Sequence, residues 1–136
     1  MKTKIFSLVS LVALTVLVAC STTEPVSKPT INALEVGLGN SKIAYIGGDL
    51  HIEAEIEAMG RIELITIMLH PEEGEGDEIL VSYTEFAGLR NTTFHKHIDI
   101  PDGTEPGEYH FHLTVTDKEG NQTAVESDVS IQELMD

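Results

Sequence analysis

Apolar and polar residues alternate with a period of two along most of this chain, and that pattern limits the folds it can adopt. The clearest cases are residues 50–57 and 109–116, where every second side chain is apolar. Successive side chains of a β-strand point to opposite faces, so such a segment buries one face and exposes the other. From residue 30 onward no segment shows the 3.6-residue apolar spacing of an amphipathic helix. The sequence therefore predicts an all-β domain.

Turn-forming Gly, Pro, Asp and Asn residues divide the domain into seven predicted strands. They cover residues 31–36, 49–57, 62–70, 79–84, 93–100, 108–116 and 123–132, with 43–46 interpreted as a continuation of the first. Their number and spacing predict an immunoglobulin-like sandwich of two antiparallel sheets, with 79–84 in the place of strand D. Tyr109 begins the sixth strand after a glycine-bearing connection, which resembles a tyrosine corner.

The first 19 residues have the layout of a secretory signal. Lys2 and Lys4 precede an apolar stretch over 5–18, and a small residue, Ala19, stands before Cys20. The apolar stretch is shorter than the roughly 20 residues that cross a bilayer. Residues 17–20 (LVAC) resemble the cleavage site of bacterial lipoprotein precursors.

That resemblance implies that Cys20 is lipidated and becomes the first residue of the mature protein, held on the membrane by its acyl chains. Residues 20–29 are then a polar tether, 30–132 the sandwich domain and 133–136 a short tail. The expected location is the cell envelope, at the outer membrane, with the periplasmic and the surface side both open.

Charge and cysteine content restrict the partners of the domain. The chain has 23 Asp and Glu; of its eight Lys and Arg, Lys2 and Lys4 leave with the signal, so six remain and the formal charge becomes −17. Such a surface repels nucleic acid and attracts cations and basic partners, although solubility alone also accounts for most of these carboxylates. Cys20 is the only cysteine, so any metal site must use His, Asp or Glu.

Two His-x-His pairs are the only residues whose spacing suggests chemistry. His95 pairs with His97, and His110 with His112. Residues two apart on a strand share a face, so both imidazoles of a pair can reach one metal ion. Neutral imidazole suits zinc, copper or nickel.

The immunoglobulin strand order predicts a third histidine beside each pair. Strand 49–57 would lie next to 93–100, and strand 62–70 next to 108–116. We expect two outward-facing clusters on opposite sheets, as candidate zinc or copper sites: His51, His95 and His97, and His70, His110 and His112. Glu53 and Asp99 would stand near the first, and Glu108 and the loop 72–78 near the second. The alternative is that all six are ordinary polar residues of solvent-facing strands, which gain charge as the pH falls.

The sequence contains few features of catalytic or calcium-binding sites. The sequence has no Gly-x-Ser-x-Gly, no His-Glu-x-x-His, no phosphate-binding glycine loop and no free thiol, so we expect no enzyme activity and no catalytic residue. The acidic stretch 70–78 does not match EF-hand spacing and is interpreted as a solvated hairpin loop.

Residues 30–132 resemble an uncharacterised family of single-domain lipoproteins from Bacteroides-type bacteria. The similar segments are 51–58 (HIEAEIEA), the strand that ends in His70-Pro71, 94–101 (FHKHIDIP) and the final hairpin 106–123. The family has no assigned activity, so the resemblance implies a fold and an envelope location. Two functions remain open: a non-catalytic module that binds an envelope protein or glycan, and a zinc- or copper-binding lipoprotein that uses the His-x-His clusters.

Overall fold

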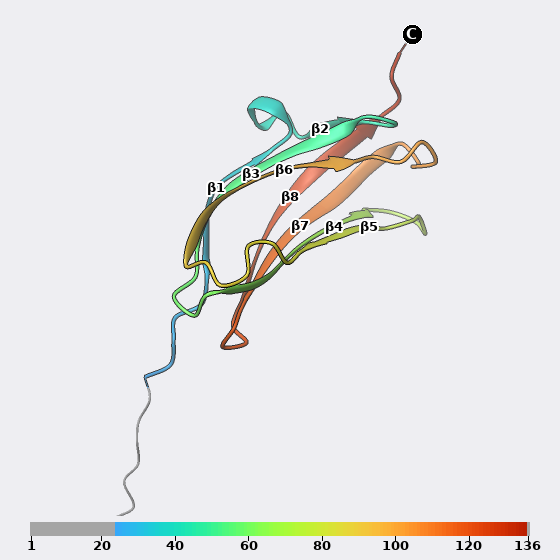
Figure 1. The fold of residues 1–136 in the computed structure, drawn as a ribbon. Helices are drawn as coiled ribbons and strands as arrows, with labels where there is room; N and C mark the ends of the chain where they lie inside the picture. Colours follow the sequence, from blue (N-terminus) through green and yellow to red (C-terminus); the bar gives the residue numbers. More distant parts are fainter. Residues whose placement is uncertain (1–23, 136) are drawn as a thin grey trace, which may run out of the picture.

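Eight strands form two sheets that pack face to face in this computed structural model, which describes residues 24–135 (Figure 1). The strands are β1 (Thr30–Val36), β2 (Ile43–Tyr45), β3 (Asp49–Glu57), β4 (Ile62–Pro71), β5 (Ile79–Tyr83), β6 (Asn91–Asp99), β7 (Gly107–Asp117) and β8 (Gln122–Gln132), and one 3-10 turn, η1 (Leu38–Asn40), follows β1. One sheet has the order β1-β3-β6 and the other β2-β8-β7-β4-β5. The predicted all-β sandwich is confirmed.

The period-two pattern defines the core. Residues that alternate inward from both sheets are buried, and Phe94 of β6 and Phe111 of β7 are the largest fully buried side chains. Burying one face of each sheet is what holds two such layers together. The predicted pairings of β3 with β6 and of β4 with β7 are both present and antiparallel.

Residues 43–45 correct one expectation. They do not continue β1 but form the separate strand β2 at the edge of the other sheet, parallel to β8, so the sandwich has eight strands and one parallel pair. The chain leaves β1 through Gly37, whose backbone (φ 78, ψ 157) lies in a region open essentially to glycine alone. This turn carries the chain from one sheet to the other.

Strand β5 corrects a second expectation. It pairs with β4, from Ile65 opposite Tyr83 to Leu69 opposite Ile79, and so extends the five-stranded sheet rather than taking the place of strand D beside β6. The short loop between β4 and β5 favours this hairpin, because neighbouring antiparallel strands are commonly joined by short connections.

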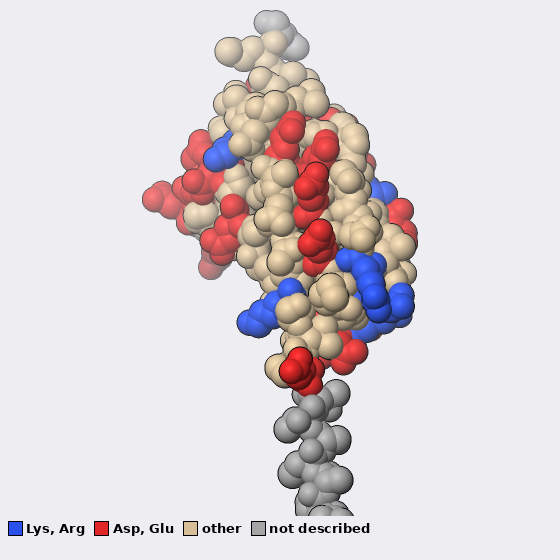
Figure 2. All heavy atoms as spheres, turned by 90° about the vertical axis from the view of Figure 1, so that its left-hand side faces the viewer, with Lys and Arg blue, Asp and Glu red and all other residues tan. Residues whose placement is uncertain are grey.

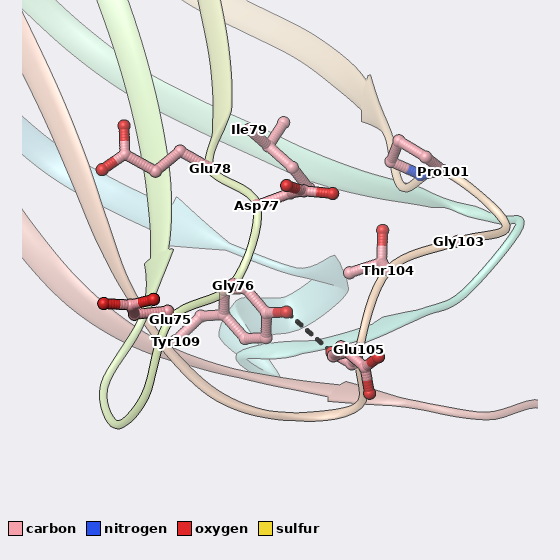
Figure 3. Close-up of a pocket in the computed structure, with 10 residues that line it drawn as sticks. All are labelled: Glu75, Gly76, Asp77, Glu78, Ile79, Pro101, Gly103, Thr104, Glu105 and Tyr109. Atoms are coloured by element: carbon pink, nitrogen blue, oxygen red, sulfur yellow. Dashed lines mark hydrogen bonds between the residues drawn. The ribbon is translucent and has the colours of Figure 1, made fainter.

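Tyr109 makes the predicted tyrosine-corner contact. Its hydroxyl donates a 2.7 Å hydrogen bond to the carbonyl oxygen of Glu105 (Figure 3). Burial, together with the nearby Glu105 and Asp77 carboxylates, raises the pKa of the Tyr109 phenol above its usual 10.0, so the group stays a hydrogen-bond donor.

The two ends of the described chain lie at opposite ends of the sandwich (Figure 1). The signal segment 1–19 and the lipidation residue Cys20 lie outside the described residues. Within residues 24–135, no helix is long and apolar enough to cross a membrane.

Candidate metal centre

The register of β3 and β6 brings His51, His95 and His97 together on the outer face of the three-stranded sheet. His51 stands opposite His97, and His95 stands opposite Glu53, two residues along β3. The ring centre of His51 is 4.8 Å from that of His95 and 5.2 Å from that of His97, and the latter two are 5.5 Å apart. One nitrogen from each ring lies within 4.8 Å of the other two. The first predicted cluster therefore converges in space.

His51 departs from the expectation that all six histidines are exposed to solvent. It alternates with the core residues Leu50 and Ile52 and so lies on the outer face, yet only 7% of it is exposed. The turn after β1 lies beside it: the backbone N–H of Gly37 donates a 2.8 Å hydrogen bond to the carbonyl oxygen of His51, and Gly37 and Leu38 line a hollow of about 500 Å³ together with His51 and His97.

The Nδ1 atom of His51 is buried and has no hydrogen-bond partner. Among the described residues it is the only buried side-chain nitrogen or oxygen in that condition. A buried polar atom without a partner costs about 1–3 kcal/mol, so native structures rarely keep one without a reason.

Two carboxylates face the other nitrogen of the same ring. Nε2 of His51 lies 3.6 Å from Glu35 Oε1 and 3.7 Å from Glu53 Oε2. A neutral imidazole has one N–H, and carboxylates can only accept it, so they favour the proton on Nε2. Nδ1 then carries the free lone pair that a metal ion requires.

Glu35 reaches His51 because β1 is irregular there. The register with β3 shifts between Asn32 and Glu35, and Ala33 has a positive φ of 52°. A bulge of this kind redirects the following side chains. Glu35 Oε1 also accepts a 2.8 Å hydrogen bond from the backbone N–H of Gly39, which ties the carboxylate to η1.

His97 has its own carboxylate partner. Its Nδ1 lies 3.1 Å from Asp49 Oδ2, within hydrogen-bond distance. Asp49 is on the same face of β3 as His51, two residues before it. The alternation of apolar and polar residues therefore contained enough information to predict Asp49 near this cluster.

Glu53 contacts His51 as expected, and Asp99 stands opposite Asp49, on the same outward face two residues beyond His97. Asp49 and Glu35 were not expected. The bulge that brings Glu35 into contact shows in the sequence only as a change of phase in the apolar positions of β1.

The second predicted cluster, on the outer face of the five-stranded sheet, is arranged differently. His70 stands opposite His110, and Nε2 of His70 lies 2.9 Å from Nε2 of His112. Nδ1 of His110 instead lies 3.6 Å from Glu72 and 3.4 Å from Asp128.

In the part of the chain that the structure describes, the nitrogens of these three histidines do not all lie close enough together to hold one ion. The close group at this cluster is instead Glu72, His110 and Asp128. Asp128 of β8 stands opposite His110, and the ring centre of His110 is 5.2 Å from that of His70 and 6.5 Å from that of His112. Glu72 belongs to the loop that was expected near this cluster, and Glu108 lies two residues before His110 on β7. Asp128 was not expected.

The acidic loop after β4 lines a hollow of about 320 Å³ with the connection from β6 to β7 (Figure 3). The carboxylates of Glu75, Asp77, Glu78 and Glu105 border it, and all four residues are exposed. Exposed carboxylates of this kind are ordinarily solvated.

Comparison with known proteins identifies the family of this chain. Residues 18–132 match the model of the domain of unknown function DUF4625. The chain therefore belongs to the DUF4625 family, an all-β sandwich domain. A comparison with curated proteins finds no significant match.

Several solved structures share the fold at low sequence identity. OgpA from Akkermansia muciniphila is similar with a TM-score of 0.60 and 10% identity, over 79% of this chain and 28% of that one. The sporulation control protein Spo0M from Bacillus subtilis has a TM-score of 0.50 and 11% identity, over 79% of this chain and 50% of the other. The chain thus spans less than a third of OgpA, and these similarities show the sandwich fold alone.

Proposed function

We propose that this protein is a non-catalytic, lipid-anchored binding domain of the cell envelope, and that it binds a divalent transition metal ion through His51, His95 and His97. The observation that carries the proposal is the buried, unpartnered Nδ1 of His51, whose ring centre lies 4.8 and 5.2 Å from those of two further imidazoles. An ion at that nitrogen replaces the missing hydrogen-bond partner.

The donor set favours zinc or copper(II). Three imidazoles prefer these ions, whereas calcium and magnesium prefer oxygen ligands. Copper(I) prefers thiolate or thioether sulfur, and the only cysteine is Cys20. Metal–nitrogen bonds of about 2.0–2.1 Å place ligand atoms about 3.3 Å apart in a tetrahedral site. The three nitrogens lie within 4.8 Å of one another, so rotation of the exposed His95 and His97 side chains must bring them closer by up to about 1.5 Å.

The envelope assignment rests first on the lipoprotein-type signal at residues 1–20 and second on the charge distribution. Four of the six basic residues of the described chain lie at the end of the sandwich where the tether enters: Lys28, Arg61, Arg90 and Lys118. The tether contacts this end, since Pro29 O accepts a 2.6 Å hydrogen bond from Thr123 Oγ1.

In Figure 2, which views the molecule from the side of β1, basic side chains gather near the tether and acidic ones run along the rest of that face. A membrane with anionic lipids attracts the first and repels the second. The end of the sandwich that carries the basic residues would then face the membrane.

A second candidate is the binding of an envelope protein or glycan beside the histidines. Leu38 (74% exposed) and Leu134 (63% exposed) border the hollow next to His51 and His97, with Tyr45 between them. Exposed apolar residues around a hollow are typical of interaction sites. A photo-crosslinker at position 38 should capture a discrete partner in intact cells, whereas one at the solvent-facing Thr116 should not.

Calorimetric titration of the full-length protein in detergent with zinc and copper(II) tests the metal proposal. We expect His51→Gln and His97→Gln each to bind one tight equivalent fewer than the wild type, and the control Thr93→Gln, on the same face of β6, to bind the same number as the wild type. Circular dichroism checks that each variant is folded. Folded His51→Gln protein that binds as many tight equivalents as the wild type contradicts the proposal.

A further inference from the structure

The site at His51 supplies three ligands, one fewer than a tetrahedral zinc ion takes. One nitrogen each of His51, His95 and His97 lie within 4.8 Å of one another, and within residues 24–135 no fourth histidine or carboxylate belongs to that group. The carboxylates of Glu35 and Glu53 face Nε2 of His51 rather than the unpartnered Nδ1. A zinc ion with three protein ligands keeps its fourth position for water or for an added ligand.

A hollow of about 500 Å³ borders this site. Two of the three histidines, His51 and His97, line it together with four side chains that are wholly or largely apolar: Leu38, Ile43, Tyr45 and Leu134. Ligand sites in proteins commonly combine apolar walls with a few polar groups in this way. Because an ion between His51 and His97 lies at the edge of the hollow, a ligand at its fourth position can extend into it.

The charges around the site favour a neutral donor at that position. Glu35, Glu53 and Asp49 each have a carboxylate oxygen 3.1–3.7 Å from a ring nitrogen of His51 or His97. Three negative charges therefore already surround a doubly charged ion. A carboxylate donor would add a fourth and be repelled, whereas a neutral imidazole adds none. Imidazole is also a ligand that suits zinc and copper.

We propose that the fourth ligand is the imidazole of a histidine in a partner protein, and that apolar residues next to that histidine pack into the hollow. This inference rests on the metal ion proposed above and defines the envelope partner by its chemistry, a surface histidine flanked by apolar side chains. The incoming imidazole displaces the water at the fourth position, so the ion links the two proteins.

The apolar surface around the hollow is large enough for a protein partner. Leu38 is 74% exposed, and Leu134 and the adjacent Met135 are 63% and 97% exposed. Covering exposed apolar side chains favours association, and patches of them mark interaction sites. They belong to η1 and to the C-terminal stretch, which lie at the end of the sandwich away from the tether (Figure 1). An anchored domain would present them away from the membrane.

Peptide titration of the full-length protein in detergent, loaded with cobalt(II), tests this inference. The visible absorption band of cobalt(II) shifts when a new ligand enters its coordination sphere. We expect acetyl-Leu-His-Leu-amide to shift the band and to bind at least about tenfold more tightly than either control peptide. One control, acetyl-Ala-His-Ala-amide, lacks the large apolar groups, and the other, acetyl-Leu-Glu-Leu-amide, offers an anionic donor.

Two leucine variants locate the contact. Leu38→Ser should weaken binding of the first peptide at least about fivefold, because an apolar wall of the hollow is lost. Leu80→Ser removes a leucine of similar exposure, 62%, from β5 of the other sheet and should leave the affinity unchanged. Equal losses in the two variants would contradict docking in the hollow.

The same experiment separates failure of the partner from failure of the metal site. Cobalt(II) uptake that His51→Gln does not reduce refutes the metal site and this inference with it. Uptake that His51→Gln reduces, but with no band shift in the wild type on addition of peptide, keeps the metal site and refutes the partner. Equal binding of the two histidine peptides also refutes the partner, because the hollow then contributes nothing.

Discussion

His51 differs from the other five histidines in being buried, and this difference is the basis for proposing it as a metal ligand. A polar residue on the outer face of a sheet normally reaches water. Here two carboxylates lie 3.6 and 3.7 Å from one nitrogen of the ring, and the other nitrogen has no partner. The neighbouring His95 and His97 are exposed and complete the proposed ligand set.

Substitution of Glu35 tests the role of the carboxylates. We expect Glu35→Gln to weaken zinc binding about 10- to 100-fold, because the amide no longer holds the proton on Nε2 of His51 with a full negative charge. Glu57→Gln, on the same face of β3 but at its far end, removes the same charge and should change the affinity little. Calorimetry measures both, and equal effects would point to general electrostatics instead of a specific contact.

Tyr109 gives a prediction about stability at high pH. Because the pKa of its phenol is raised in the folded state, its contribution is fully present below the unfolded value of about 10 and is lost as the pH rises through the higher folded value. Tyr109→Phe should cost about 1–3 kcal/mol at neutral pH, since Glu105 O loses its donor.

The Tyr109→Phe variant should also lose less stability than the wild type between neutral pH and pH 11. Tyr83, whose pKa is also raised, chiefly by burial, supplies the remaining alkaline effect. Urea unfolding at several pH values measures this, and parallel losses in both proteins would contradict it.

At the scale of elements, alternation and turn residues predict the strands well and the pairing of edge strands poorly. Strand β3 has the predicted ends, 49 and 57, because Gly47-Gly48 and Gly60 bound a regular alternation. The strand pairs that carry the histidines followed from the immunoglobulin order.

The position of β2, the position of β5 and the contact of Glu35 could not be predicted from the alternation. They depend on a glycine-only backbone, on loop length and on a bulge, none of which changes the period of the sequence. The β8 carboxylates opposite His110 and His112 depend on the register of the last hairpin, which the sequence analysis did not derive.

Gly37 tests the turn beside His51. A Cβ at Gly37 would lie 2.4 Å from Ser41 Oγ and 3.0 Å from the backbone nitrogen of Lys42, whereas one at Gly39 meets nothing within 4 Å. The backbone of Gly37 (φ 78, ψ 157) also lies in a region open essentially to glycine, whereas that of Gly39 (φ 63, ψ 25) lies in the left-handed region, so Gly37→Ala adds both a clash and the greater strain. We expect Gly37→Ala to cost at least about 1–3 kcal/mol and to weaken zinc binding, and Gly39→Ala to cost less. Equal unfolding free energies of the two variants would contradict this explanation.

At the scale of the whole molecule, the proposed anchor and the charge distribution predict an orientation of the domain. The tether and four basic residues share one end, while the histidine clusters lie on the outer faces of the two sheets. An anchored domain that stands on its basic end would leave both faces accessible to ions and partners.

Amide exchange of the lipidated protein in vesicles tests this orientation. We expect the turns around Arg61 and Lys118 to exchange more slowly on anionic than on neutral vesicles, and the difference to disappear at high salt. It should also disappear in Arg90→Glu/Lys118→Glu but remain in Lys42→Glu, which changes a basic residue at the other end. Protection that does not depend on lipid charge would contradict the orientation.

The central claim, a metal ion held by His51, is tested most directly by a crystal structure of the zinc-soaked protein with anomalous data collected at the zinc edge. The predicted result is an anomalous peak within about 2.0–2.1 Å of Nδ1 of His51 and of one nitrogen each of His95 and His97. A clean map with no peak among these three side chains, at zinc concentrations that saturate binding in solution, would contradict it.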